Sequence, residues 1–286
     1  MFVEAIEKAK QFTRPIHTIS RLFKSKEILP GAATLFFVNE EGYALTCKHV
    51  VNLLLQAEQI NKRFSLIKSE KHASEGEIER KYKINRTQPL QLKNTFVDCV
   101  DKLQSFTTHV HPKYDLAIIK FNGFEKLMVN EFAVFKKDAN EIKQGKFLCR
   151  LGYPFPEFNN FKYNEAQDDI QWTSQGNRQS PSFPIEGMVT RFQLDQQRFK
   201  YGIELSTPGL KGQSGGPLFD ENGVVCGMQS RTKHLHLGFD LENKEIFAAG
   251  KKKKINDYSF IHLGECIHVD VIKDFLRQHH VSFNET

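Results

Sequence analysis

The sequence predicts an all-β protein with a short helix near each end. Phenylalanine occurs 25 times, against 7 tyrosines and 1 tryptophan, and aromatic and β-branched residues favour strands. Short apolar runs alternate with turn residues, and four runs between residues 185 and 230 have the spacing of a small antiparallel barrel. The 286 residues are enough for one large β domain or two smaller ones.

Composition argues against several functional classes. The net charge of +6 is mild, and the lysine run 251–254 has no interleaved aromatic residues, so we expect no nucleic-acid binding. The five cysteines form no CxxC motif and no close pair, which favours a reducing compartment. Residues 1–10 do not resemble a secretory signal, and no stretch is long and apolar enough to span a membrane. We therefore expect a cytoplasmic protein with no membrane association.

In the first part of the chain, residues 2–12 have apolar positions at helical spacing and predict an amphipathic helix, which packs on the body or docks a partner. The apolar runs 31–38 and 43–51, joined by a turn cluster, predict a β-hairpin. Its second strand is expected to end at His49.

Residues 52–94 are polar and weakly helical, which predicts a surface excursion. Short apolar runs predict strands at 95–100 and again at 114–121, where Asp115 begins a buried strand. A carboxylate at the mouth of a buried strand needs a partner. Residues 122–146 read as a linker between two halves.

The second half begins with a predicted strand at 145–154 and a long polar loop at 155–184. Further strands are predicted at 185–194, 200–206, 216–219, 223–230 and 259–269. A variable loop before the last strand holds His234, His236 and the lysine run. Residues 269–278 have apolar positions at helical spacing, an acid in the first turn and a base in the last, and predict a helix.

These elements divide the chain into four expected parts. They are an N-terminal segment (1–29), a first barrel (30–135), a second barrel (136–268) and a C-terminal helix (269–286).

The stretch GQSGGPLF, residues 212–219, concentrates three glycines around one hydroxyl. Glycine permits backbone conformations that place bare N–H groups beside a side-chain oxygen, as a nucleophile with an oxyanion site requires. A glycine-rich turn with an exposed serine is the alternative. His49, Asp115 and Ser214 are separated by 66 and 99 residues, so a cleft between the two halves would bring them together.

This order and context resemble the chymotrypsin-like serine peptidases. GYALTCKHVV is similar to the histidine motif of that family, YDLAIIKF to its aspartate motif and GQSGGPLF to its serine motif. The LGYP string and the strand after SGGPLFDENG look like peptidases of the high-temperature-requirement type, over residues 30–269 and without their peptide-binding module. The resemblance implies two six-stranded antiparallel β-barrels and a protein or peptide substrate.

The resemblance also implies roles for the site residues. His49 would take the proton of Ser214 as it attacks a carbonyl, Asp115 would hold the imidazole, and the N–H groups of Gly212 and Ser214 would bind the oxyanion. No cofactor is expected.

Specificity is predicted from the segments that flank the serine. The trypsin subgroup has an aspartate six positions before the serine, where this chain has Pro208, so a preference for Arg or Lys is not supported. Pro208, Gly227, Met228 and Gln229 are expected to line the primary pocket and to favour an apolar or small residue. Their strand could also pair with an extended substrate.

Gln213 stands where secreted digestive relatives have the aspartate that pairs with a newly cut N-terminus, so zymogen cleavage by that route is not expected. We expect loop ordering to control activity, with residues 56–94 and 155–184 as gates. The N-terminal helix or these loops would bind a regulatory partner.

Two other functions fit parts of the sequence. GQSGG also matches the nucleophile elbow of esterases, but that motif needs a helix after the serine and acid and histidine later in the chain. A silent peptidase-like module that binds without cutting is the other alternative. His234 with His236, and Cys266 with His268, show only two metal ligands each, so we predict no metal site.

Overall fold

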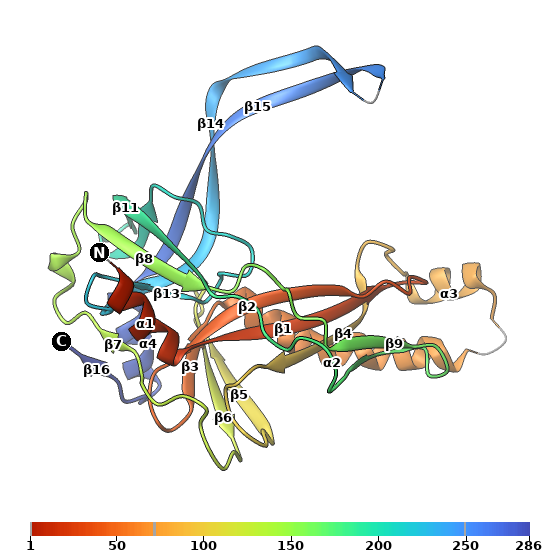
Figure 1. Ribbon diagram of the computed structural model, residues 1–286, viewed down its shortest axis with the longest axis horizontal. Coiled ribbons are helices and arrows are strands. Elements are labelled where there is room, and N and C mark those ends of the chain that lie inside the picture. Colours follow the sequence, from red (N-terminus) through yellow and green to blue (C-terminus); the bar gives the residue numbers. More distant parts are fainter. Residues whose placement is uncertain (1, 71–72, 249) are drawn as a thin grey trace.

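The computed structural model describes residues 2–70, 73–248 and 250–286, and its two main sheets pack against each other (Figure 1). The first sheet has six antiparallel strands in the spatial order β4-β1-β2-β3-β6-β5. Their bounds are β1 Thr13–Leu22, β2 Leu29–Phe37, β3 Tyr43–Thr46, β4 Pro89–Phe96, β5 Ser105–Val110 and β6 Ala117–Asn122.

The second sheet has eight strands, in the order β13-β8-β11-β12-β15-β14-β7-β16, and β13 also pairs with β14. Their bounds are β7 Val134–Phe135, β8 Phe147–Gly152, β11 Phe183–Leu194, β12 Lys200–Leu205, β13 Pro217–Phe219, β14 Val225–Ala248, β15 Lys251–His268 and β16 Asn284–Glu285. The expected pair of six-stranded antiparallel barrels is thus met only in part. β7 pairs in parallel with β14 and β16, because short flanking segments satisfy the backbone groups of a free edge.

Residues 13–22 belong to the first sheet, although the sequence assigned them to an N-terminal segment. As β1 they pair with β2 on one side and β4 on the other. The buried positions of β1 include Thr13, His17 and Arg21. Because polar residues occupy buried positions, the sequence lacks the alternation of apolar and polar residues that predicts a strand.

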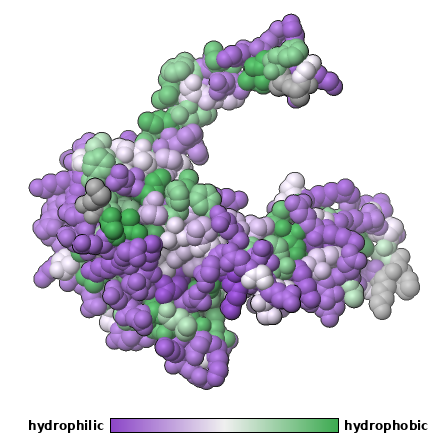
Figure 2. Space-filling view, viewed as in Figure 1, coloured by the Kyte–Doolittle hydropathy of each residue, from purple (hydrophilic) through white to green (hydrophobic). Residues whose placement is uncertain are grey.

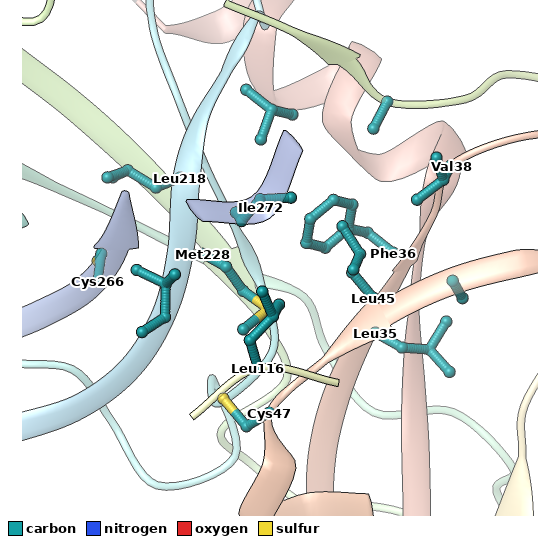
Figure 3. Close-up of a cluster of buried hydrophobic side chains, with 14 of the residues drawn as sticks. Leu35, Phe36, Val38, Leu45, Cys47, Leu116, Leu218, Met228, Cys266 and Ile272 are labelled. Atoms are coloured by element: carbon teal, nitrogen blue, oxygen red, sulfur yellow. The ribbon is translucent and has the colours of Figure 1, made fainter. Parts of the chain in front are cut away.

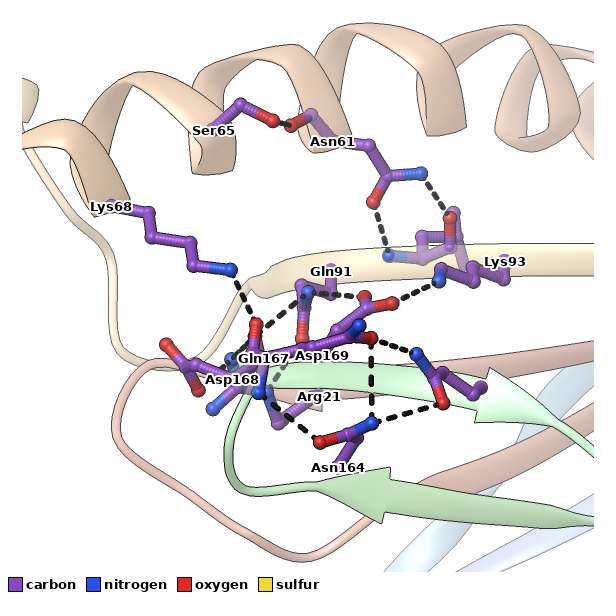
Figure 4. Close-up of polar contacts among 12 residues, drawn as sticks. Arg21, Asn61, Ser65, Lys68, Gln91, Lys93, Asn164, Gln167, Asp168 and Asp169 are labelled. Carbon is purple, nitrogen blue, oxygen red and sulfur yellow. Dashed lines mark hydrogen bonds and ion pairs between the residues drawn. The ribbon is translucent and has the colours of Figure 1, made fainter.

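The polar excursion contains two helices, α2 (Lys48–Ser69) and α3 (Glu75–Tyr82). Asn61 of α2 bonds both backbone groups of Leu92 on β4, with its Nδ2 2.7 Å from the carbonyl oxygen (Figure 4). The predicted loop 155–184 contains the hairpin β9 (Phe161–Asn164) and β10 (Asp169–Trp172). Arg21 and Lys93 pair with Asp168 and Asp169 of this hairpin at 2.8 and 2.7 Å, and so fix it beside α2 and β4.

The predicted variable loop after residue 230 is instead the outer part of one long hairpin. β14 and β15 pair as far as Ala248 and Lys251 and project from the body as an arm (Figure 1). Apolar side chains along the arm are exposed, among them Phe239 and Phe247 (Figure 2). Because register shifts follow Gln229, His236 and Leu241, the alternation of apolar residues is interrupted and gives no strand signal.

The main hydrophobic core spans both sheets (Figure 3), and two smaller clusters lie around Phe158 and Phe64. Helix α1 (Val3–Phe12) buries Ala5, Ala9 and Phe12 in the main core, so its apolar face packs on the body and is not free for a partner. Helix α4 (Val269–Gln278) has the predicted bounds and also packs on the core. A 3₁₀ helix covers Ala139–Glu141. No helix among the described residues is both long enough and apolar enough to cross a membrane.

Candidate active site

His49 and Asp115 meet because β3 and β6 are paired neighbours in the first sheet. β3 ends at Thr46, so His49 is the second residue of α2 and not, as expected, the end of the strand. Its Nδ1 lies 2.8 Å from Oδ2 of Asp115, and its backbone N–H donates to Oδ1 at 3.0 Å. The carboxylate therefore satisfies an open N–H of the first helical turn, where the helix dipole favours a negative charge.

Asp115 is held in its ionised form by its hydrogen bonds. Burial alone would raise the pKa of this carboxyl group, but donors from His49 and Ser230 outweigh burial and lower the pKa to about 2. The Ser230 hydroxyl donates to Oδ2 at 2.7 Å. An ionised Asp115 accepts the Nδ1 proton of His49, which leaves the lone pair on Nε2, the atom that a general base uses.

Ser214 lies in a loop whose shape depends on glycine. Gly212 has a φ of 99°, and a Cβ there would stand 2.6 Å from the carbonyl oxygen of Tyr153. Gly215 has a φ of 88°, and its Cβ would stand 2.1 Å from the carbonyl oxygen of Thr34. Among the described residues, the N–H groups of Gly212 and Ser214 have no hydrogen-bond acceptor. The loop thus presents two free donors beside the serine.

Thr34 of β2 connects this loop to the first sheet. Its hydroxyl donates to the carbonyl oxygen of Gly212 at 2.8 Å and accepts the N–H of Tyr153 at 3.1 Å. Its backbone N–H donates to the carbonyl oxygen of Ser214 at 3.0 Å. A fully buried threonine therefore sets the position of the glycine loop relative to the sheet that carries His49.

His49 and Ser214 line the same two pockets, of about 490 and 510 Å³. The Ser214 hydroxyl donates to the carbonyl oxygen of Ser230 at 3.2 Å and makes no hydrogen bond to His49 in this structure. Rotation about its χ1 would redirect the hydroxyl, and catalytic hydrogen bonds are often absent before substrate binds. His49 and Ser214 thus face the same space, while Asp115 lies behind His49 and lines neither of these two pockets.

Two of the four predicted specificity residues line the 490 Å³ pocket, namely Pro208 and Gln229. Met228 does not, because it is fully buried in the core with Leu218 (Figure 3). Gly227 is also absent from the lining and lies against the carbonyl oxygen of Ile267. Neighbouring residues of a strand point to opposite faces, so Gln229 and Met228 could not both face the pocket.

One group of possible metal ligands coincides with the site. Single ligand atoms of Cys47, His49 and Asp115 lie within 4.8 Å of one another. Burial raises the pKa of the Cys47 thiol well above its ordinary value, which disfavours the thiolate that binds metals. His234 and His262 face each other across the arm, with their Nδ1 atoms 2.6 Å apart.

Sequence reasoning missed Thr34 and Ser230 as site residues. Thr34 lies within an apolar strand, and its loop contacts are 178 and 119 residues away. Ser230 is the polar end of the run GVVCGMQS, which marks a strand end, but its partner Asp115 is 115 residues distant. No local pattern reports contacts at such separations.

The chain is similar to one family of known proteins in sequence and to two solved structures in fold. Two solved structures similar to this chain are the HtrA-type protease AlgW with a decapeptide, at 13% identity and a TM-score of 0.49, and a variant of AlgW with a tripeptide, at 14% and 0.47. Both alignments cover 97% of this chain, but only 67% and 63% of those chains. No curated protein is significantly similar in sequence. Residues 33–228, more than half of the sequence, match the trypsin-like peptidase domain, and the chain therefore belongs to that family.

Proposed function

We propose that this protein is a serine endopeptidase that cleaves polypeptides through an acyl-enzyme on Ser214. The observation that carries the proposal is the double contact of Asp115 with His49 beside a pocket that Ser214 also lines. Asp115 holds the imidazole through Nδ1, which leaves Nε2 to take a proton. Membership of the trypsin-like peptidase family supports the same chemistry.

The reaction would proceed in two halves. Ser214 Oγ attacks the scissile carbonyl carbon while His49 Nε2 takes the hydroxyl proton, and His49 then gives that proton to the leaving amine. Water, activated by the same imidazole, hydrolyses the resulting ester. The free N–H groups of Gly212 and Ser214 would stabilise the oxyanion, and one such donor contributes about 3–4 kcal/mol in comparable enzymes.

We also propose that loop ordering controls access to Ser214. Pro89 and Leu92 from the segment 56–94, and Pro156 from the segment 155–184, line the 510 Å³ pocket beside the serine. A shift of either segment would change the shape of that pocket. The resting hydrogen bond from Ser214 to the Ser230 carbonyl fits an enzyme that completes its site when substrate binds.

A fluorophosphonate probe tests the proposed function, because it reacts only with an activated serine. The wild-type protein should be labelled, Ser214→Ala should not, and the exposed Ser105→Ala should be labelled like the wild type. Equal labelling of Ser214→Ala and wild type would contradict the assignment.

A module that binds peptides without cutting them is the second candidate, and the same hydrogen bond of Ser214 away from His49 favours it. That module would show no labelling of the wild type under any condition. An esterase of the nucleophile-elbow type fits less well, because strand β13 follows the glycine loop where that motif needs a helix.

A further inference from the structure

The 490 Å³ pocket beside Ser214 carries positive charge and no negative charge on its described lining. Lys211 and Arg231 line it, together with the imidazoles of His49, His234 and His262. Arg231 is paired with Glu265, whose side chain is almost fully buried. Lys211 is exposed and makes no ion pair with any described residue. The pocket therefore contains at least one uncompensated cation at its rim.

A second uncompensated cation lies behind the pocket wall. The side chain of Arg150 on β8 is fully buried, and among the described residues its guanidinium donates only to uncharged oxygens. These are the carbonyl oxygen of Thr207 at 3.1 Å, the Thr207 hydroxyl at 2.6 Å and Oε1 of Gln229 at 2.8 Å. Its Nε has no partner, and no described carboxylate lies within ion-pair distance. An arginine keeps its charge at physiological pH, so burial without a counter-ion lowers stability.

Gln229 forms the wall between this guanidinium and the pocket. Its Oε1 accepts from Arg150, while its Nε2 lies on the side of Gly209, where an added Cβ would stand only 2.2 Å from it. Gln229 and Gly209 both line the pocket. Nε2 of Gln229 donates to the backbone carbonyl oxygens of Arg231 at 3.0 Å and Glu265 at 3.4 Å. These contacts fix the amide in place, so only the Gln229 side chain separates the Arg150 guanidinium from the pocket.

From these charges we infer the substrate class: the enzyme cleaves after an acidic residue, glutamate or aspartate, whose carboxylate occupies the pocket lined by Lys211 and Gln229, with Arg150 behind Gln229. The inference rests on the proposed peptidase function. It replaces the expectation of an apolar or small residue, which was based on Met228 and Gln229 as lining residues. Met228 is buried elsewhere, and the charges now decide the preference.

The pocket lies where the side chain of the residue before the scissile bond would enter, since Ser214 and His49 form one side of it. A carboxylate there would supply the counter-charge that Arg150 and Lys211 lack, whereas an arginine or lysine side chain would be repelled. A carboxylate about 7 Å from an unscreened cation, at an effective dielectric constant of about 20, gains a factor of about 50 over a neutral group.

The test compares fluorogenic tripeptide substrates that differ only in the residue before the cleaved bond, with Glu, Asp, Gln, Ala and Arg in turn. Glu and Gln are nearly isosteric, so the ratio of their kcat/KM values isolates the charge. We expect a ratio of at least ~10 for the wild type at low salt, a smaller ratio at high salt and no measurable cleavage after Arg.

Three variants assign the preference. Lys211→Gln should lower the ratio of kcat/KM for the Glu substrate to that for the Gln substrate several-fold, and Arg150→Met should bring this ratio close to one. Lys143→Gln, which removes a charge from an exposed loop residue remote from the pocket, should leave the ratio unchanged. Since Arg150→Met alters a buried site, each variant is first titrated with the fluorophosphonate probe, and rates are expressed per labelled protein.

Two results would overturn the inference in distinguishable ways. A labelled wild-type enzyme with a Glu to Gln ratio near one, or one that keeps its ratio in both Lys211→Gln and Arg150→Met, would refute the acidic preference alone. A wild type that is never labelled would refute the peptidase function, and the preference with it.

Discussion

Thr34 is a direct test of the idea that the first sheet positions the serine loop. Its hydroxyl joins the carbonyl oxygen of Gly212 to the N–H of Tyr153, at 2.8 and 3.1 Å, in a region with no solvent exposure. Valine has nearly the same shape as threonine but cannot make either hydrogen bond. Thr34→Val therefore leaves one buried carbonyl and one buried N–H without partners.

The expected cost follows from these two groups. A buried polar group that loses its partner destabilises the folded state by about 1–3 kcal/mol, so the loss of two partners in Thr34→Val should lower the free energy of unfolding by about 2–6 kcal/mol. The Gly212 carbonyl also loses its tether, and the N–H groups that would bind the oxyanion lose their fixed position. We expect the fluorophosphonate labelling rate to fall by about 10- to 100-fold, somewhat less than deletion of an oxyanion donor costs.

Urea unfolding and labelling kinetics measure the two effects on the same protein. Thr34→Ser is the matched control, because it keeps the hydroxyl and removes only a methyl group, so its labelling rate should stay near that of the wild type. The reasoning is refuted if Thr34→Val labels as fast as Thr34→Ser, since the hydroxyl would then not position the loop.

Two further predictions follow from buried polar groups. Ser230→Ala removes the 2.7 Å donor to Asp115, so it should slow labelling about 10-fold and lower the free energy of unfolding in urea by about 1–3 kcal/mol. An unchanged labelling rate would show that the His49 contacts alone suffice to hold the carboxylate. Burial lowers the pKa of His17 to about 4, although Asp98 opposes the shift, so its neutral form stabilises the fold fully above the unfolded pKa near 6.5. About 3 kcal/mol of unfolding free energy should be lost as the pH falls from 6.5 to 4, and His17→Gln should flatten that part of the urea-stability profile; an equally steep profile in the variant would assign the loss to other groups.

Local sequence predicted the elements whose signal lies within one segment. The strand at 145–154 and the helix at 269–278 were found because their apolar residues follow a regular period. The order of His49, Asp115 and Ser214 led to the peptidase family, to which the chain belongs. Their roles as a triad remain part of the proposal.

The sequence did not predict the strands whose apolar residues follow no regular period or whose buried residues are polar. β1 buries His17 and Arg21, and distant partners make that burial tolerable. Ser180 lies 163 residues from His17, and Gln91 and Asp168 lie 70 and 147 residues from Arg21. The arm formed by β14 and β15 has register shifts that break its alternation, so the sequence read as a variable loop. Only the pairing of the two strands defines it.

The sequence by itself determined the family and the three residues proposed for the chemistry, because their motifs are local and depend on residue type. Tertiary structure decided what surrounds them. Thr34 and Ser230 contact the site only because the two sheets pack together. Met228 does not line the pocket, because alternate residues of a strand point to opposite faces. The proposed effect of Arg150 on the pocket depends on the distance of its charge in space, which no spacing along the chain reports.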